Sequence, residues 1–217
     1  MNAVGTEGDV RTLLHEGGHA FHALAAAGEW FYPYRHAPLE FCEVASMGME
    51  LLSREHLGAF YSPEEAARAN YDQLESIISL LLWIAVVDAF QHWIYAHPGH
   101  RPDERAAQWL ELHRTFMTGA VDWSGLEEER RYLWHRQLHI FLHPFYYIEY
   151  GIAQLGALQL WVRARRDFAA ALAAYQQALA LGGSRPLPEL FTAAGLKFDF
   201  SETTIAPLME EIQAAIA

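Results

Sequence analysis

The sequence predicts a mainly α-helical protein. Alternating apolar and polar positions, the pattern of half-buried strands, are nearly absent, while apolar positions recur at helical spacing along most of the 217 residues. Helix start and stop signals divide this pattern into segments of ordinary helix length. With 52% hydrophobic and 19% charged residues, the composition is globular and excludes collagen-like and disordered chains. No linker indicates a second domain, and a chain of this length buries roughly 70% of its surface on folding.

Local signals place three helices in the first half of the chain. Thr6 followed by Asp9 resembles a capping box, and Gly28 suits the end of the helix that starts there. Ser62-Pro63-Glu64-Glu65 is a stronger start signal, with an N-cap serine, a proline at the first helical position and a glutamate at the third. The elements expected here are helices from about 6 or 9 to 27, over 39–56 and over 63–95, with a weak extended piece over 30–34.

The second half is divided by turns and by further caps. Ser124 with Glu127 is expected to cap one helix, and Pro144 to interrupt it. Asp167 is expected to cap an alanine-rich helix that ends at two glycines, 182 and 183. The helices expected in this half cover 103–117, 124–142, 145–165, 168–181, 186–196 and 206–216.

Charge argues against a nucleic-acid partner. The chain has 15 Lys and Arg against 27 Asp and Glu, a net charge of −12 with neutral histidines. Binding to phosphates needs clustered basic residues, so we expect no nucleic-acid partner. The aromatic content of 13% is too high for a disordered acidic tail.

Cysteine content, the N-terminal residues and the longest apolar run predict a cytoplasmic protein without a membrane span. The single cysteine, Cys42, excludes an intrachain disulfide and a cysteine-rich zinc site, and it fits a reducing compartment. The first 11 residues lack the basic and then apolar pattern of a signal peptide. The most apolar run, Ile77 to Val87, is shorter than the roughly 18 residues that a span needs, so it predicts a buried helix.

The most specific motif is His15-Glu16-Gly17-Gly18-His19, an H-E-x-x-H within a helical pattern. Residues four apart lie on one face of a helix, so both imidazoles can reach one metal ion. Glu16 projects about 100° away around the helix, where it can accept a proton from a metal-bound water without binding the metal. This arrangement is suited to amide hydrolysis by zinc. In a chain with 12 histidines the string can also occur by chance.

A catalytic zinc site usually needs a third protein ligand. Along the helix axis, His22 is roughly 10 Å from His15 and converges poorly, so a polar wall residue is the expectation for it. Cys42 would be a soft ligand, but a single buried thiol more often packs than binds metal. A carboxylate on the second predicted helix closes the site well, but helical periodicity does not choose between Glu40 and Glu43, which share one stripe with Met47 and Glu50. The candidates are therefore His22, Glu40, Cys42 and Glu43.

Three segments together resemble the oligoendopeptidase F family, which is related to thimet oligopeptidase. They are H-E-G-G-H-A-F-H at 15–22, E-V-A-S at 43–46 and P-F-Y-Y-I-E-Y at 144–150, in the family's order. The resemblance implies a multi-helix, zincin-type catalytic domain built around the H-E-x-x-H helix, with one Zn²⁺ per chain. It implies that His15, His19 and Glu43 bind zinc and that Glu16 is the general base. Ser46 and Glu50 also match recurrent family positions, and we expect them to support the ligands.

The resemblance also implies a substrate-side element. In the family, tyrosine hydroxyls and a histidine hydrogen-bond the scissile carbonyl as it becomes an oxyanion. The candidates here are His139, Tyr146 and Tyr150, with His143 as an alternative histidine and Tyr147 as a weaker tyrosine candidate. Tyr146 and Tyr150 are four apart, so a continuous helix would turn both toward one cleft. Gly18 is the family's usual residue at its position, and we expect it to allow a close approach of backbone or substrate.

Members of this family are much longer than this chain. We therefore expect residues 1–217 to be the catalytic, C-terminal part of such a metallopeptidase, without the helical N-terminal part. The resemblance implies a zinc metalloendopeptidase acting on short peptides. Surface meant for the missing part would be exposed and would favour self-association or instability. The alternatives are a zinc-binding but catalytically incomplete fragment that acts as an interaction module, and an unrelated helical binding protein with an accidental motif.

Overall fold

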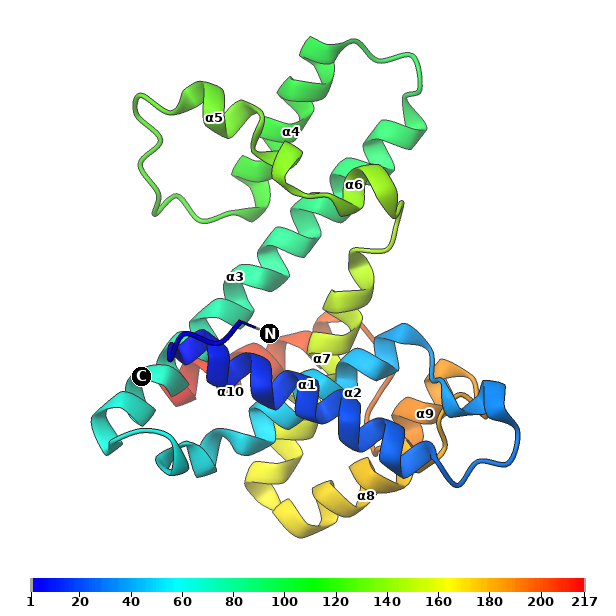
Figure 1. Cartoon of the computed structure of the whole chain (residues 1–217). Helices are drawn as coiled ribbons and strands as arrows, with labels where there is room; N and C mark the ends of the chain where they lie inside the picture. Colours follow the sequence, from blue (N-terminus) through cyan, green and yellow to red (C-terminus); the bar gives the residue numbers. More distant parts are fainter. Residues whose placement is uncertain (1, 217) are drawn as a thin grey trace. The chain divides into compact units, whose positions relative to one another are not determined.

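The chain folds into helices joined by turns (Figure 1). The computed structural model describes residues 2–216, and none of them forms a β-strand, which confirms the mainly α-helical prediction. The elements, with η for a 3₁₀ helix, are α1 (Glu7–Ala26), η1 (Tyr32–Arg35), α2 (Leu39–Leu52), η2 (Ser53–Ala59), α3 (Pro63–Ala96), α4 (Pro102–Phe116), α5 (Glu127–Arg131), η3 (Leu133–Arg136), α6 (His139–Leu142), α7 (Ile148–Arg166), α8 (Phe168–Ala180), α9 (Leu187–Ala193) and α10 (Glu202–Ile216).

The cap signals in the sequence start helices where they were expected to. Before α1, the carboxylate of Asp9 accepts the backbone N–H of Thr6 at 2.8 Å. Before α3, the carboxylate of Glu65 accepts the backbone N–H of Ser62 at 2.9 Å. Before α8, the carboxylate of Asp167 accepts the backbone N–H of Ala170 at 3.0 Å. Each contact satisfies a donor that the helix start leaves unpaired.

The fold divides into two compact units. Unit 1 comprises the residues up to Leu74 and those from Ile152 onward, and unit 2 comprises Glu75–Gly151. Helices α3 and α7 each contribute residues to both units.

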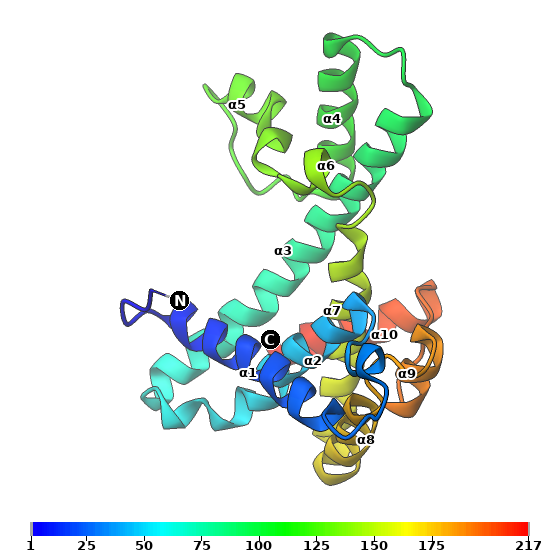
Figure 2. The ribbon, with the colours of Figure 1, turned by 45° about the vertical axis from the view of Figure 1, so that its right-hand side comes forward.

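In unit 1, α1 packs along α2, and α8 and α9 pack against this pair (Figures 1 and 2). The contact between α1 and α2 is close because Gly18 has no side chain. A Cβ there would lie 2.5 Å from Cα of Ser46 and 2.6 Å from the carbonyl oxygen of Ala45. The close approach expected at Gly18 is therefore made by the backbone of α2, and it brings the H-E-x-x-H segment against the E-V-A-S segment.

Unit 2 has its own aromatic core. The indole of Trp109 on α4 is fully buried, and its ring centroid lies 5.5 Å from that of Trp83 and 5.2 Å from that of Phe90, both on α3. Trp134 and Ile140 close this core from η3 and α6. The core holds the segment from residue 133 to 150 in place around α3.

Three predicted elements are wrong in detail. The helix expected over 124–142 is replaced by the short elements α5, η3 and α6, because Trp134 turns into the core and Gln137 adopts an extended backbone between them. Helix α7 begins at Ile148 rather than 145, because Phe145 has a left-handed φ of 61° that a helix does not allow. The piece expected to be extended forms η1 instead.

The long helix α3 is apolar over more of its length than the run Ile77 to Val87 indicates. By length and composition alone it could cross a membrane. Core helices pass the same test, and Ile84, Val86, Val87 and Phe90 of α3 lie in the core of unit 2. The burial expected for the run Ile77 to Val87 is confirmed for Ile77, Ile84, Val86 and Val87.

Candidate functional site

Helix α1 presents two imidazoles one turn apart. The ring centroids of His15 and His19 lie 4.9 Å apart at an interplanar angle of 84°, and both side chains are about one-third exposed or less. Glu16, between them in sequence, is exposed. The helical spacing read from the sequence thus gives two neighbouring imidazoles with an exposed carboxylate beside them.

Helix α2 adds a carboxylate to this pair. Oε2 of Glu43 lies 3.4 Å from Nε2 of His15 and 4.0 Å from Nε2 of His19. One ligand atom from each of the three residues lies within 4.8 Å of the other two, and no other group of three such residues between 2 and 216 meets this criterion. Two imidazoles and one carboxylate form a donor set that suits a catalytic zinc ion with an open fourth position.

Two further side chains of α2 hold this cluster. Nδ1 of His15 lies 2.7 Å from Oε1 of Glu50, so the ring is held from the side opposite Glu43. The hydroxyl of Ser46 donates to Oε2 of Glu43 at 3.0 Å. Partners of this kind fix the orientation of metal ligands and increase their basicity.

The acidic neighbours change the charge state of this cluster when no metal is bound. Hydrogen bonds to Glu43 and Glu50 raise the pKa of His15 to about 10. Burial alone would raise the pKa of Glu43, but hydrogen bonds from His15 and Ser46 outweigh burial, and the pKa is lowered. A metal ion that takes the place of the His15 proton therefore meets a carboxylate that is already ionised.

The other candidate ligands do not belong to the group of three. Glu40 lies outside it, and the thiol of Cys42 lies 3.5 Å from the carbonyl oxygen of Ala37, with its pKa raised by burial. His22 is not the polar wall residue that was expected. It is 5% exposed, its ring lies 6.1 Å from that of Phe41, and burial lowers its pKa to about 4.

The substrate-side candidates form a separate cluster in unit 2. The ring centroid of His139 lies 5.8 Å from that of Tyr146, 5.7 Å from that of Tyr150 and 5.0 Å from that of Tyr147. Nε2 of His139 lies 3.5 Å from the hydroxyl oxygen of Tyr150. The alternative, His143, lies 6.1 Å from His139, centroid to centroid. Burial and the neighbouring His143 lower the pKa of His139.

Tyr146 lies in this cluster but, contrary to expectation, not on the same helix as Tyr150. It precedes the first residue of α7, so the pair Tyr146 and Tyr150 does not share a continuous helix. Their ring centroids are nevertheless 5.5 Å apart. The turn at Phe145 positions Tyr146, a feature that helical spacing does not predict.

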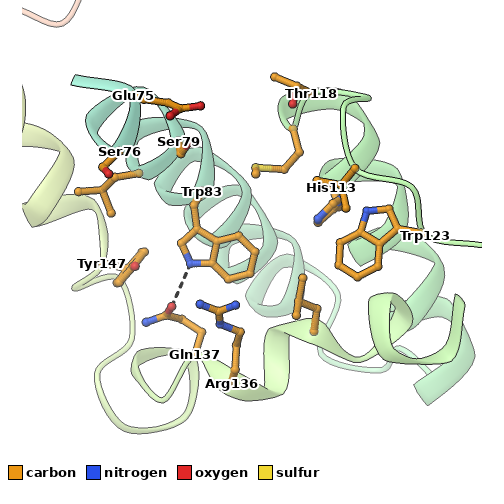
Figure 3. Close-up of a pocket in the computed structure, with 14 residues that line it drawn as sticks. Glu75, Ser76, Ser79, Trp83, His113, Thr118, Trp123, Arg136, Gln137 and Tyr147 are labelled. Atoms are coloured by element: carbon orange, nitrogen blue, oxygen red, sulfur yellow. Dashed lines mark hydrogen bonds between the residues drawn. The ribbon is translucent and has the colours of Figure 1, made fainter. Parts of the chain in front are cut away.

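Sequence reasoning missed the residues that support His139. Gln137 contacts both His139 and Trp83, and with Trp83 and Tyr147 it lines a cavity of about 660 Å³ in unit 2 (Figure 3). The only sequence signal is an amide residue two positions before a histidine, which is too common to indicate a function.

Comparison with known proteins gives one family match and several solved structures of similar fold. The model of Peptidase family M3 matches residues 1–210. PZ peptidase A, solved with an inhibitor, is 33% identical and superposes with a TM-score of 0.89. A structure assigned to oligoendopeptidase F is 34% identical with a TM-score of 0.85, and another, from Bacillus anthracis str. Ames, is 32% identical with a TM-score of 0.78. No curated protein matches the sequence.

These matches involve nearly all of this chain but only part of each neighbour. They cover 99%, 97% and 97% of the chain, and 38%, 37% and 34% of the three solved chains in the same order. The chain therefore spans little more than a third of the length of the structures that it matches.

Proposed function

Because the chain belongs to peptidase family M3, we propose that it carries the zinc site and the catalytic residues of a metalloendopeptidase that hydrolyses short peptides. The observation that carries the proposal is the convergence of His15, His19 and Glu43, whose ligand atoms lie within 4.8 Å of one another. Within a peptidase family, such a donor set supports metal-assisted hydrolysis over a purely structural role.

The residues of α1 and α2 have distinct roles in this proposal. A bound Zn²⁺ supplies a Lewis acid and lowers the pKa of a water molecule toward about 7. His15, His19 and Glu43 hold the ion. Glu16 accepts the proton of the attacking water and later delivers it to the leaving amine. Its exposure on α1 supports this role, because a general base must reach both solvent and substrate.

In unit 2 we assign the donors for the developing oxyanion to His139, Tyr146 and Tyr150. Preorganised donors of this kind each contribute about 3–4 kcal/mol to transition-state stabilisation. Their clustering within hydrogen-bond or ring contact of one another supports a shared function.

The proposal is tested by metal analysis and turnover on the same preparations. We expect about one zinc per chain in the wild type and in Glu16→Gln, and its loss in His15→Ala. Cleavage of a quenched short peptide should fall at least about 10²-fold in Glu16→Gln, because the proton acceptor is removed. Glu64→Gln, which changes an exposed glutamate at the start of α3, is the matched control and should retain the wild-type rate.

A second candidate is a zinc-binding fragment without turnover. It is favoured by the chain's coverage of only 38% of the PZ peptidase A chain. Stoichiometric zinc with no cleavage by the wild type would support this candidate over the enzyme. Cleavage that survives Glu16→Gln would contradict the assignment of the general base.

A further inference from the structure

The amide of Gln137 lies between an indole and an imidazole. Nε1 of Trp83 is 3.0 Å from Oε1 of Gln137, and Nε2 of Gln137 is 2.6 Å from Nδ1 of His139. Figure 3 shows the first of these contacts on the wall of the unit 2 cavity. All three side chains are shielded from solvent in part.

Trp83 determines the orientation of the amide. An indole N–H donates and has no lone pair with which to accept, so the atom of Gln137 that faces it must be the carbonyl oxygen. The NH₂ group of Gln137 then faces His139. The reverse orientation would bring two N–H donors together at Trp83 and leave both unsatisfied.

The amide in turn determines where His139 carries its proton. Because the NH₂ group of Gln137 donates to Nδ1, this nitrogen must offer a lone pair, and the proton of the neutral ring lies on Nε2. We propose that Gln137 is a positioning residue that keeps His139 neutral and in the Nε2–H tautomer. An imidazolium would present an Nδ1–H to the NH₂ group, two donors facing each other.

The hydrogen bonds then run in one direction. Trp83 donates to Gln137, Gln137 donates to His139, and Nε2–H of His139 points toward the hydroxyl oxygen of Tyr150 at 3.5 Å. The hydroxyl hydrogen of Tyr150 is left to be donated onward. His139 and Tyr150, two of the three residues that the proposed function assigns to the oxyanion, thus each present a hydrogen-bond donor, and this catalytic consequence rests on that proposed function.

The surroundings of His139 favour the same neutral state. The rings of His143, Tyr146, Tyr147 and Tyr150 lie next to the ring of His139. Arg136, which lies 5.4 Å from the ring of Trp83, adds a positive charge to the same wall. None of these groups offers the negative charge that would pair with an imidazolium.

The inference is tested by two-bond ¹H–¹⁵N correlation spectra of the full chain, with the His139 signals identified by their loss in His139→Asn. We expect the wild-type ring to carry its proton on Nε2. Gln137→Glu replaces the NH₂ donor with a carboxylate, so the proton should move to Nδ1 and the pKa of His139 should rise. Trp83→Phe frees the amide to turn, so both tautomers should be populated. Arg136→Met, the control, should leave the wild-type tautomer unchanged.

A wild-type ring protonated on Nδ1, or an Nε2–H tautomer unchanged in both Gln137→Glu and Trp83→Phe, would overturn the inference. Since the spectra need no turnover, they decide it whether or not the chain cleaves peptides. If the chain is active, Gln137→Glu should lower kcat about 10²-fold with little change in KM, because one oxyanion donor is lost. A changed tautomer with an unchanged kcat would contradict the role of His139 in the proposed function and leave the tautomer assignment standing.

Discussion

Glu50 contacts the cluster of His15, His19 and Glu43 through a single atom, Nδ1 of His15, at 2.7 Å. Replacing it by glutamine keeps the shape of the side chain but substitutes a neutral acceptor for a charged one, which weakens the hydrogen bond and lowers the basicity of His15. We predict that Glu50→Gln reduces zinc affinity about 10- to 100-fold, measured by competition with a chromophoric chelator.

The matched control for this measurement is Glu40→Gln on the same helix. Glu40 shares a helical stripe with Glu43 and Glu50 but lies outside the group of three ligand residues. Its affinity for zinc should equal that of the wild type. A loss in Glu40→Gln as large as that in Glu50→Gln would mean that general negative charge on α2, rather than a directed hydrogen bond, holds the metal.

His22 links stability to pH. Burial lowers its pKa to about 4, whereas an unfolded histidine has a pKa of about 6.5. Between these values the unfolded chain binds a proton that the folded chain does not, so stability falls as pH falls through this window. In metal-free protein we predict that lowering the pH from 7 to 5 costs the wild type about 2 kcal/mol more unfolding free energy than it costs His22→Leu. Urea titrations measure both, and equal losses would contradict the prediction.

At the scale of elements, the two adjacent glycines of the H-E-x-x-H helix have opposite consequences. A Cβ at Gly18 would overlap the backbone of α2, whereas a Cβ at Gly17 has nothing within 4 Å. We predict that Gly18→Ala destabilises unit 1 by about 1–3 kcal/mol through overpacking between α1 and α2. Gly17→Ala should stabilise the protein by about 1 kcal/mol, because alanine is the better helix former. Urea unfolding of the two variants checks this, and destabilisation of the same size in both would show that helix contact is not the cause.

Helix starts could be predicted from sequence because caps are local. The carboxylates of Asp9, Glu65 and Asp167 each accept a backbone N–H three residues away, so no tertiary information is needed. The interval between α4 and α7 could not be predicted. The path of this interval depends on the burial of Trp134 against α3 and on the left-handed turn at Phe145. Local helix propensity predicts neither feature.

The same distinction separates the parts of the candidate site. The pairing of His15 with His19 follows from helical spacing within one element. Helical periodicity does not choose between Glu40 and Glu43, because both residues lie on one stripe. The family resemblance implies Glu43, and the packing of α2 on α1 brings Glu43 beside His15 and His19. The contact from Gln137 to His139 lies in an irregular segment, where no period exists to predict it.

At the scale of the whole molecule, large apolar side chains remain exposed at the C-terminal end of α1 and in the segment after it. The exposed fractions are 71% for Leu24, 84% for Trp30 and 66% for Tyr32. Clustered exposed apolar groups are typical of surfaces that bind another protein surface. In a chain that matches little more than a third of its solved neighbours, we propose that this surface promotes self-association of the isolated chain.

Sedimentation velocity over a series of concentrations tests that proposal. We predict that the wild type sediments as a concentration-dependent mixture and that the double variant Leu24→Gln, Trp30→Ser associates at least tenfold more weakly. The reason is that burying one leucine side chain stabilises a contact by about 1.5–3 kcal/mol, and about 1.4 kcal/mol corresponds to a tenfold change in affinity. Val4→Ser removes an apolar side chain that is 81% exposed outside this segment, and it should associate like the wild type. A wild type that stays monomeric at every concentration, or a Val4→Ser effect as large as that of the double variant, would show that this surface does not drive association.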